Sequence, residues 1–190
     1  MESKVFQLCV WSMDKWMKQA AKFLQIPPVT LPDHLSHTRA HFHQDQIHVL
    51  AVHTTQISIH EAPKLECLAQ WVPRVSSGLI TDAVYSCDSQ SVYACLEDGT
   101  VNILTATTKS FELRCRVDPS AYLPSNPSLI HPVVVVSHPS EPNQFAVGLT
   151  DGRVHVLEPL ESEGKWGTSN PVDDAGPSSS SAAGSDQQPR

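Results

Sequence analysis

The sequence has 190 residues, a net charge of −7 and a charged fraction of only 17%. Binding to a nucleic-acid backbone depends on clustered Lys and Arg, so this acidic chain without a basic run is not expected to contact DNA or RNA directly. The 15 prolines favour a chain with many turns over one built from long helices.

The five cysteines restrict the class of protein further. Their number is odd and no two are closely spaced, which favours reduced thiols over the disulfide framework of a secreted domain. Residues 1–10 show no signal peptide, and no apolar stretch approaches the ~20 residues that span a bilayer. We therefore expect an intracellular chain without a membrane partner.

Four short segments repeat one alternating pattern along the chain. In each segment the second and fourth residues are apolar, as in a strand with one buried face. The segments are 7–11, 56–60, 100–104 and 153–157. Their spacing is close to the ~40–50 residues of a four-stranded propeller blade.

Three of these segments follow another strand across a tight turn. The turns contain Thr54-Thr55, Asp98-Gly99 and Asp151-Gly152. Asp-Gly between alternating apolar runs predicts a hairpin, because glycine adopts positive φ at little cost. The preceding strands are expected at 48–53, 92–96 and 145–149.

Flanking apolar runs complete the blades. The inner strands are expected at 80–86 and 132–137, and the outer strands at 65–71 and 111–117. This arrangement predicts complete blades at 38–73 and 79–118, a third at 129–160 without its outer strand, and a preceding half blade made of 5–11 and an outer strand near 21–26. The fold class is therefore all-β, a partial WD-repeat β-propeller of about three to four blades of antiparallel strands.

The segment after Ser12 also permits a helix. Ser12 is a helix-capping residue type, and the apolar residues that follow it have helical spacing. They are Met13, Trp16, Met17, Ala20, Phe23 and Leu24. The register of the repeat favours a strand after Ala20 instead.

The composition changes from Glu161 onward to Ser, Gly and Pro, with almost no apolar residue after Trp166. Such a segment buries too little apolar surface to offset its ordering entropy. We therefore divide the chain into a half blade and connection at 1–37, WD-type propeller blades at 38–160, and a mostly disordered C-terminal tail at 161–190.

Several stretches resemble the C-terminal end of the plant TOPLESS and TOPLESS-related transcriptional corepressors. They are QLCVW (7–11), FHQDQ (42–46), KLEC (64–67), SCDSQ (86–90), LRCRV (113–117), PSAYLP (119–124), FAVGL (145–149) and EPLESEGKWG (158–167). The family's WD signature is weak here, since only Trp11 occupies the usual Trp position, and His60, Leu104 and Leu157 replace it elsewhere.

The resemblance implies a piece of the second WD-repeat propeller of a large nuclear protein. It implies a non-catalytic protein-interaction scaffold in negative regulation of transcription, with protein partners from a transcriptional repression complex. Nothing in the chain resembles the family's helical recruitment domain, so no motif-binding residue carries over.

Open edges of an incomplete propeller suggest two further outcomes for this chain. It self-associates or pairs with full-length relatives, and thereby interferes with them. Alternatively, it is a truncated product without independent function.

Seven of the ten histidines lie between His34 and His60. His37, His41 and His43 raise the hypothesis of a zinc-binding module, because alternate strand residues share a face. No CxxC pair accompanies them, so we favour structural histidines and predict no metal and no cofactor.

No catalytic residue is predicted either. The chain lacks a GxSxG elbow and a glycine-rich phosphate loop. Asp88, Asp98 and Asp151 occupy turn positions by pattern, and we interpret them as turn residues.

Four residues are candidates for protein contact because their types dominate binding hot spots. They are Trp71, Arg74, Tyr122 and Trp166. Trp and Tyr also pack between blades, so burial in the core is the alternative for the aromatic ones.

Overall fold

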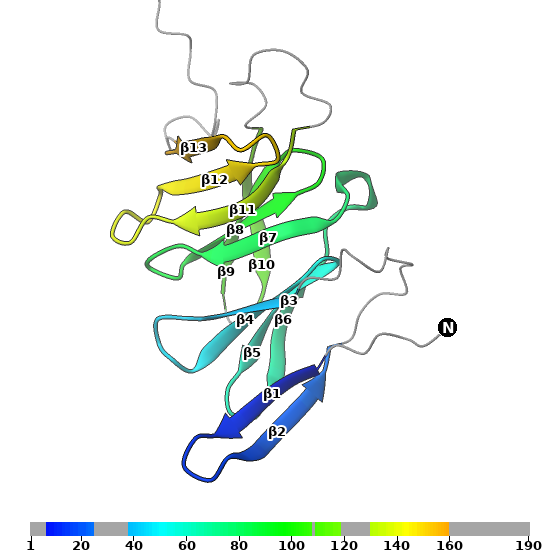
Figure 1. The fold of residues 1–190 in the computed structure, drawn as a ribbon, viewed down its shortest axis with the longest axis vertical. Coiled ribbons are helices and arrows are strands. Elements are labelled where there is room, and N and C mark those ends of the chain that lie inside the picture. The colour runs from blue at the N-terminus through cyan, green and yellow to red at the C-terminus, as the bar shows by residue number, and fades with distance from the viewer. Residues whose placement is uncertain (1–6, 25–37, 108, 119–129, 160–190) are drawn as a thin grey trace, which may run out of the picture.

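The computed structural model describes residues 7–24, 38–107, 109–118 and 130–159. It consists of antiparallel sheets stacked along the long axis of the molecule (Figure 1). The hairpin sheet contains β1 (Gln7–Ser12) and β2 (Met17–Phe23). Almost all of the described regular structure is β, which confirms the predicted fold class.

Two four-stranded sheets form the middle of the stack. The first contains β3 (Thr38–Phe42), β4 (His48–His53), β5 (Gln56–Glu61) and β6 (Glu66–Trp71). The 3-10 turn η1 (Val75–Ser77) leads to the second, which contains β7 (Ile80–Tyr85), β8 (Ser91–Leu96), β9 (Val101–Ala106) and β10 (Phe111–Val117). In both sheets the strand order follows the chain, as in a propeller blade.

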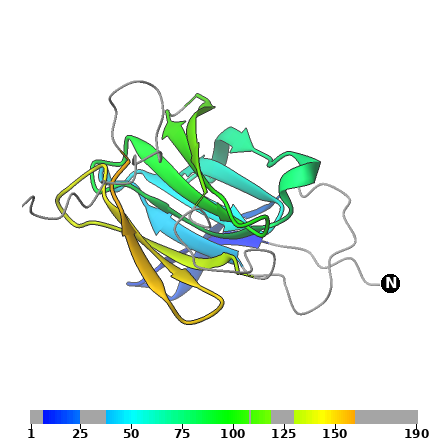
Figure 2. The same cartoon turned by 90° about the horizontal axis from the view of Figure 1, so that it is seen from above.

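The terminal sheet closes the other end of the stack with three strands. They are β11 (Pro132–Ser137), β12 (Phe145–Leu149) and β13 (Val154–Leu157). Seen from above, successive sheets are rotated relative to one another (Figure 2). The tail at 161–190 lies outside the described residues, and the division at residues 37 and 160 stays a prediction.

Two apolar clusters hold the stack together. One lies between the two four-stranded sheets and includes Leu50, Ile59 and Leu104. The other lies between the second four-stranded sheet and the terminal sheet and includes Ile103 and Phe145. The alternation of apolar residues on β9 thus supplies both clusters, because successive side chains of a strand point to opposite faces.

The same irregularity recurs where the third and fourth strands of a sheet pair. The register shifts once between Val10 and Trp11, once between Ile59 and His60, and once opposite the Ile103–Leu104 step. A β-bulge at a fixed position is a designed feature of a repeat. Trp11, His60 and Leu104 are therefore structurally equivalent positions, as the sequence pattern predicted.

The helix considered for the segment after Ser12 is wrong. Residues 17–23 pair with β1, and the strand begins at Met17, earlier than the predicted 21–26, of which 25 and 26 lie outside the described residues. The turn explains this start: Trp16 has a φ of 50°, and Leu65, which precedes β6, has a φ of 58°. Both outer strands thus begin directly after a left-handed residue.

Candidate functional site: polar turns and the hollow at the inner strands

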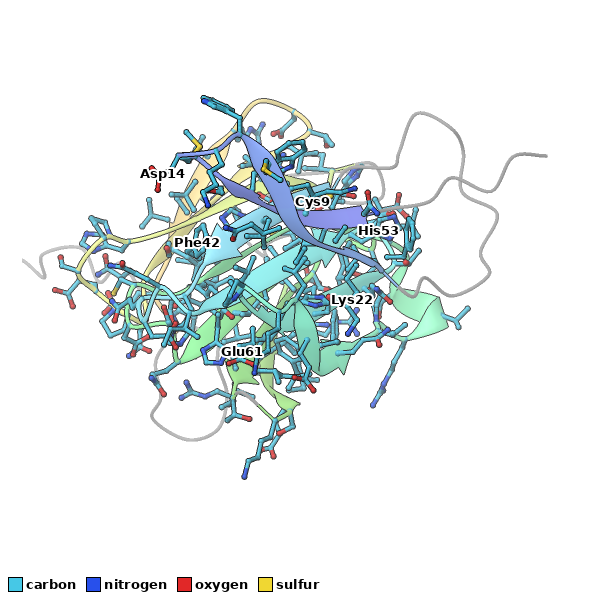
Figure 3. All side chains as sticks on the ribbon, turned by 90° about the horizontal axis from the view of Figure 1, so that it is seen from below. Cys9, Asp14, Lys22, Phe42, His53 and Glu61 are labelled. Atoms are coloured by element: carbon cyan, nitrogen blue, oxygen red, sulfur yellow. The ribbon has the colours of Figure 1, made fainter. Side chains whose placement is uncertain are left out.

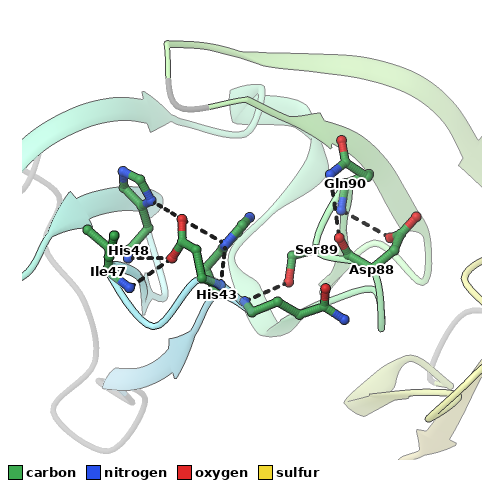
Figure 4. A network of polar contacts seen from close by, with 8 residues as sticks. His43, Ile47, His48, Asp88, Ser89 and Gln90 are labelled. Atoms are coloured by element: carbon green, nitrogen blue, oxygen red, sulfur yellow. Dashed lines mark hydrogen bonds and ion pairs between the residues drawn. The ribbon is translucent and has the colours of Figure 1, made fainter.

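The histidine-rich segment forms the turn between β3 and β4. Asp45 Oδ1 accepts the amide hydrogens of Ile47 at 2.8 Å and of His48 at 3.0 Å (Figure 4). The other carboxylate oxygen lies 2.5 Å from His48 Nδ1 and 3.1 Å from His43 Nδ1. This is an Asx turn, in which a short side chain satisfies backbone donors.

These contacts set the charge of the turn. Burial by itself raises the pKa of Asp45. Hydrogen bonds from the amide and side chain of His48 and from the Ile47 amide outweigh this effect, and the nearby His43 adds to them, so the pKa lies well below its usual range. Asp45 is therefore a carboxylate at neutral pH. It is fixed in place by groups of its own turn.

The donor atoms of His43, Asp45 and His48 lie within 4.8 Å of one another, which is the spacing of a metal site. However, His43 Nδ1 accepts the amide hydrogen of Asp45 at 3.1 Å, and the Asp45 carboxylate is saturated by the turn. His41 is not part of this cluster, and His37 lies outside the described residues. The turn itself accounts for the clustering of these side chains.

The neighbouring sheet repeats this turn with other residues. Asp88 Oδ1 accepts the amide hydrogen of Gln90 at 3.0 Å and the Ser86 hydroxyl hydrogen at 2.6 Å. The two turns also touch, since the Gln44 amide donates to Ser89 Oγ at 3.1 Å (Figure 4). The repeat identifies these polar residues as parts of the scaffold.

The remaining predicted turn aspartates behave alike. Asp98 Oδ1 accepts the amide hydrogen of Thr100 at 3.0 Å, and Asp151 Oδ1 accepts that of Arg153 at 3.0 Å. Gly99 and Gly152 follow with φ of 93° and 85°. The interpretation of these aspartates as turn residues is confirmed.

A hollow of about 220 Å³ opens where the inner strands of three sheets begin. Its lining comes from β3, β7 and β11 and from the turns beside them. The lining residues are Arg39, Thr54, Leu79, Ile80, Thr81, Glu97, His131 and Val133. Ligand sites are usually concave regions lined mainly by apolar residues with a few polar groups.

Most polar groups of the hollow already serve the scaffold. Glu97 Oε2 accepts the Leu79 amide hydrogen at 3.0 Å, and Thr81 donates to the Pro132 carbonyl oxygen at 2.7 Å. Thr54 differs, because its buried hydroxyl has no hydrogen-bond partner among the described residues. Val133 in turn is a partly exposed apolar side chain. The hollow therefore offers an apolar wall, because its one unpaired hydroxyl, that of Thr54, is covered from solvent.

Asp82 follows Thr81 of the hollow in the chain and joins the three sheets. Its Oδ1 lies 2.8 Å from Arg39 Nη1 of the first four-stranded sheet. Its Oδ2 accepts the Val135 amide hydrogen of the terminal sheet at 2.9 Å. A buried carboxylate is tolerated only when it is paired and hydrogen-bonded, and Asp82 meets both conditions. It fixes the relative position of the sheets that line the hollow.

The predicted contact residues do not gather at the hollow. Trp71 is partly buried against the cluster between the four-stranded sheets, and Arg74 is exposed directly before η1. Tyr122 and Trp166 lie outside the described residues. Sequence reasoning missed Asp82, Glu97 and Thr54. The sequence offered one signal for these residues. Asp82 is an acidic residue within a predicted inner strand that is otherwise mostly apolar.

Stacked antiparallel sheets in chain order, with a bulge at a fixed position, define part of a WD-type β-propeller. Solved structures agree with this class. The C-terminal WD40 domain of Sif2 superposes with a TM-score of 0.52 at 14% identity, covering 73% of this chain and 36% of that chain. The β-propeller domain of Cps50 (Swd1) from Myceliophteria thermophila gives 0.52 at 12% identity, over 73% and 47% of the two chains. At such identities the likeness shows the fold alone.

No protein-family model matches the sequence, but curated relatives do. Topless-related protein 4 of Arabidopsis thaliana is 66% identical over 97% of this chain, and Protein TOPLESS of the same plant is 51% identical over 93%. Protein TPR3 of Oryza sativa subsp. japonica is 51% identical over 97%. The chain spans 16–17% of the length of these relatives. Over the segment it spans, the chain belongs to the TOPLESS family.

All five cysteines are free thiols in the structure. Among the described ranges, no helix has the length and apolarity to cross a bilayer.

Proposed function

We propose that this chain is a non-catalytic protein-interaction scaffold that acts in the nucleus in TOPLESS-type transcriptional corepression. Family membership and the propeller fold support this function. Because the chain spans only about one-sixth of its relatives, their full activity and partners belong to the proposal as well. No reaction is proposed for the chain.

The observation that carries a binding role is the hollow bordered by three sheets. The apolar Val133 and Leu79 form part of its lining. A protein segment that inserts an apolar side chain complements this lining. Scaffold bonds already engage Glu97, Thr81 and Arg39, which argues for passive binding over acid–base chemistry.

The partly buried Trp71 and the exposed Arg74 form a second proposed contact area at the end of β6. Trp and Arg are the residue types most enriched among hot spots of protein interfaces. We assign this area a supporting role, because Trp71 also packs against the core.

A promoter-tethering experiment tests the proposal. The chain is fused to a DNA-binding domain in plant cells, and reporter output is measured at matched protein levels. We expect output to fall with the natural chain and to recover with Val133→Arg, which fills the hollow. Leu113→Arg is the matched control, because Leu113 is an exposed apolar residue of the outer strand β10.

Two results would overturn the proposal in different ways. Equal output with the tethered chain and with the empty tether would remove the corepressor function of this segment. Full repression by Val133→Arg would leave the function but remove the hollow as its contact site.

A further inference from the structure

The two ends of the stack expose opposite faces of equivalent strands. At one end, Val154 and Val156 of β13 are 69% and 71% exposed, whereas the equivalent Val101 and Ile103 of β9 are 0% and 1% exposed. At the other end, Trp11 of β1 is 57% exposed, whereas the equivalent His60 is 2% exposed. The end strands thus carry side chains that the interior of the stack buries completely.

The exposed side of the terminal sheet is a flat apolar surface. Its residues form two rows across the three strands, Val134–Gly148–Val154 and Val136–Ala146–Val156. We call this surface the valine face. At the equivalent rows of the second four-stranded sheet, Cys95, Val101, Tyr93 and Ile103 lie buried against the terminal sheet. The valine face therefore corresponds to a sheet-packing interface that the described part of the molecule leaves open.

The hairpin sheet exposes the complementary kind of surface. Its outward side carries Cys9, Trp11, Ala21 and Phe23, together with Gln7 and Lys18, the cross-strand partners of Phe23 and Trp11, and all of them are exposed. We call it the hairpin face. Figure 3 views the stack from this end, with Cys9 pointing outward from the hairpin. The hairpin face thus presents two aromatic side chains, which bury a large apolar area when they are covered, and the valine face presents β-branched and small residues.

We infer that the valine face of one copy of this chain binds the hairpin face of a second copy, and that two such contacts close a ring of two chains. Both faces continue the stacking geometry of the interior, where the second four-stranded sheet packs one face on the first four-stranded sheet and the other on the terminal sheet.

The size of the stack also favours two copies. The chain contains two four-stranded sheets, one three-stranded sheet and one hairpin. It covers 36% and 47% of the two solved propeller domains named above. Two copies approach a full ring of about seven blades, within the range that propellers adopt. A head-to-tail contact produces a closed ring when its rotation closes, and an open filament otherwise.

Light scattering on the purified chain across a dilution series is the first test. We expect a species of twice the 20.8 kDa chain mass that dissociates on dilution. A monomer at every concentration would overturn the inference, and so would open-ended assemblies. Association with a full-length relative without any self-association would also overturn it.

Charge placed on either face should separate the copies. We expect Val154→Asp combined with Val156→Asp, and separately Trp11→Asp, to raise the dimer Kd roughly tenfold, since each removes apolar surface from the contact and puts a charged group in its place. Val75→Asp is the matched control, because Val75 is fully exposed on η1, outside both faces. It should leave the Kd unchanged.

Mixing the two face variants tests the head-to-tail arrangement. Each variant alone spoils both contacts of the ring, but a mixed pair retains one unaltered contact and should dimerise. If Trp11→Asp alone still dimerises, the valine faces pair with each other and the inference is wrong. Should the Asp variants fail to fold by circular dichroism, Val154→Thr with Val156→Thr replaces them, because threonine keeps the strand preference and removes only apolar surface.

Discussion

The second four-stranded sheet and the terminal sheet are built on the same pattern but have different surroundings. In the former, both faces of β8 and β9 are buried, whereas in the latter β13 has one covered and one open face. The sequences Val101-Asn102-Ile103-Leu104 and Val154-His155-Val156-Leu157 are near equivalents. The comparison teaches that an alternating pattern fixes which side chains share a face, while the position in the stack decides whether that face is buried.

The largest expected difference is in the loss of stability when Ile103 and Val156 are each replaced by Ala. Ile103 fills the cluster that joins the second four-stranded sheet to the terminal sheet, so Ile103→Ala should lower the free energy of unfolding by about 3 kcal/mol through lost burial and a cavity. Val156→Ala should cost about 0.5 kcal/mol or less in the single chain. Urea unfolding at low protein concentration measures both. Equal losses would mean that the valine face is covered.

Asp82 provides the next contrast, because Val134 stands at its equivalent position in the terminal sheet. Asp82→Ala should cost about 2 kcal/mol, since it removes the partner of Arg39 and the acceptor of the Val135 amide hydrogen. The surface pair of Arg116 and Asp98 is the control. Arg116→Ala should cost less than about 1 kcal/mol. A loss at Asp82 no larger than this would remove its role in joining the sheets.

Replacement of the glycine in either Asp-Gly turn should lower the stability by the same amount. Gly99 and Gly152 have positive φ, and a Cβ at either position would meet no close neighbour. Replacement by Ala should therefore cost about 1 kcal/mol at each position through backbone strain alone. Thermal unfolding of the two variants measures the costs. A marked difference between them would show that the surroundings of the turns contribute as well.

The smallest expected effect is on the pH dependence of the free energy of unfolding. It arises at His60 and has no counterpart at the equivalent position of the hairpin sheet, where Trp11 does not titrate. Burial lowers the pKa of His60 below its ordinary 6.5, and the Leu65 carbonyl only partly offsets this. The unfolded chain then binds more protons than the folded one below pH 6.5, so stability should fall as pH drops through that range. We expect His60→Gln to reduce this slope in urea unfolding between pH 7 and pH 5. An unchanged slope would assign the acid sensitivity to other groups, among them the partly buried His41 and the buried His53, whose pKa values burial also lowers.

Local patterns in the sequence determined most of the strands, their order and the polar turns. Alternation of apolar residues, the Asp-Gly pairs and the spacing of the repeat depend on neighbours within a few residues, so they are legible without a structure. The start of β2 at Met17 was missed, because the apolar residues of this segment follow helical spacing and do not alternate as in a strand. The pairing with β1 decided it.

Only the tertiary structure decided which of these side chains are buried and paired and which lie on an exposed face. Residues far apart in sequence, such as Arg39, Asp82 and Val135, meet because three inner strands converge, and no local pattern encodes that convergence. The same holds for Trp71, a contact candidate by residue type that packs partly into the core. The open valine face and hairpin face follow from the ends of the stack, since burial depends on what lies against a sheet and not on the sheet's own sequence.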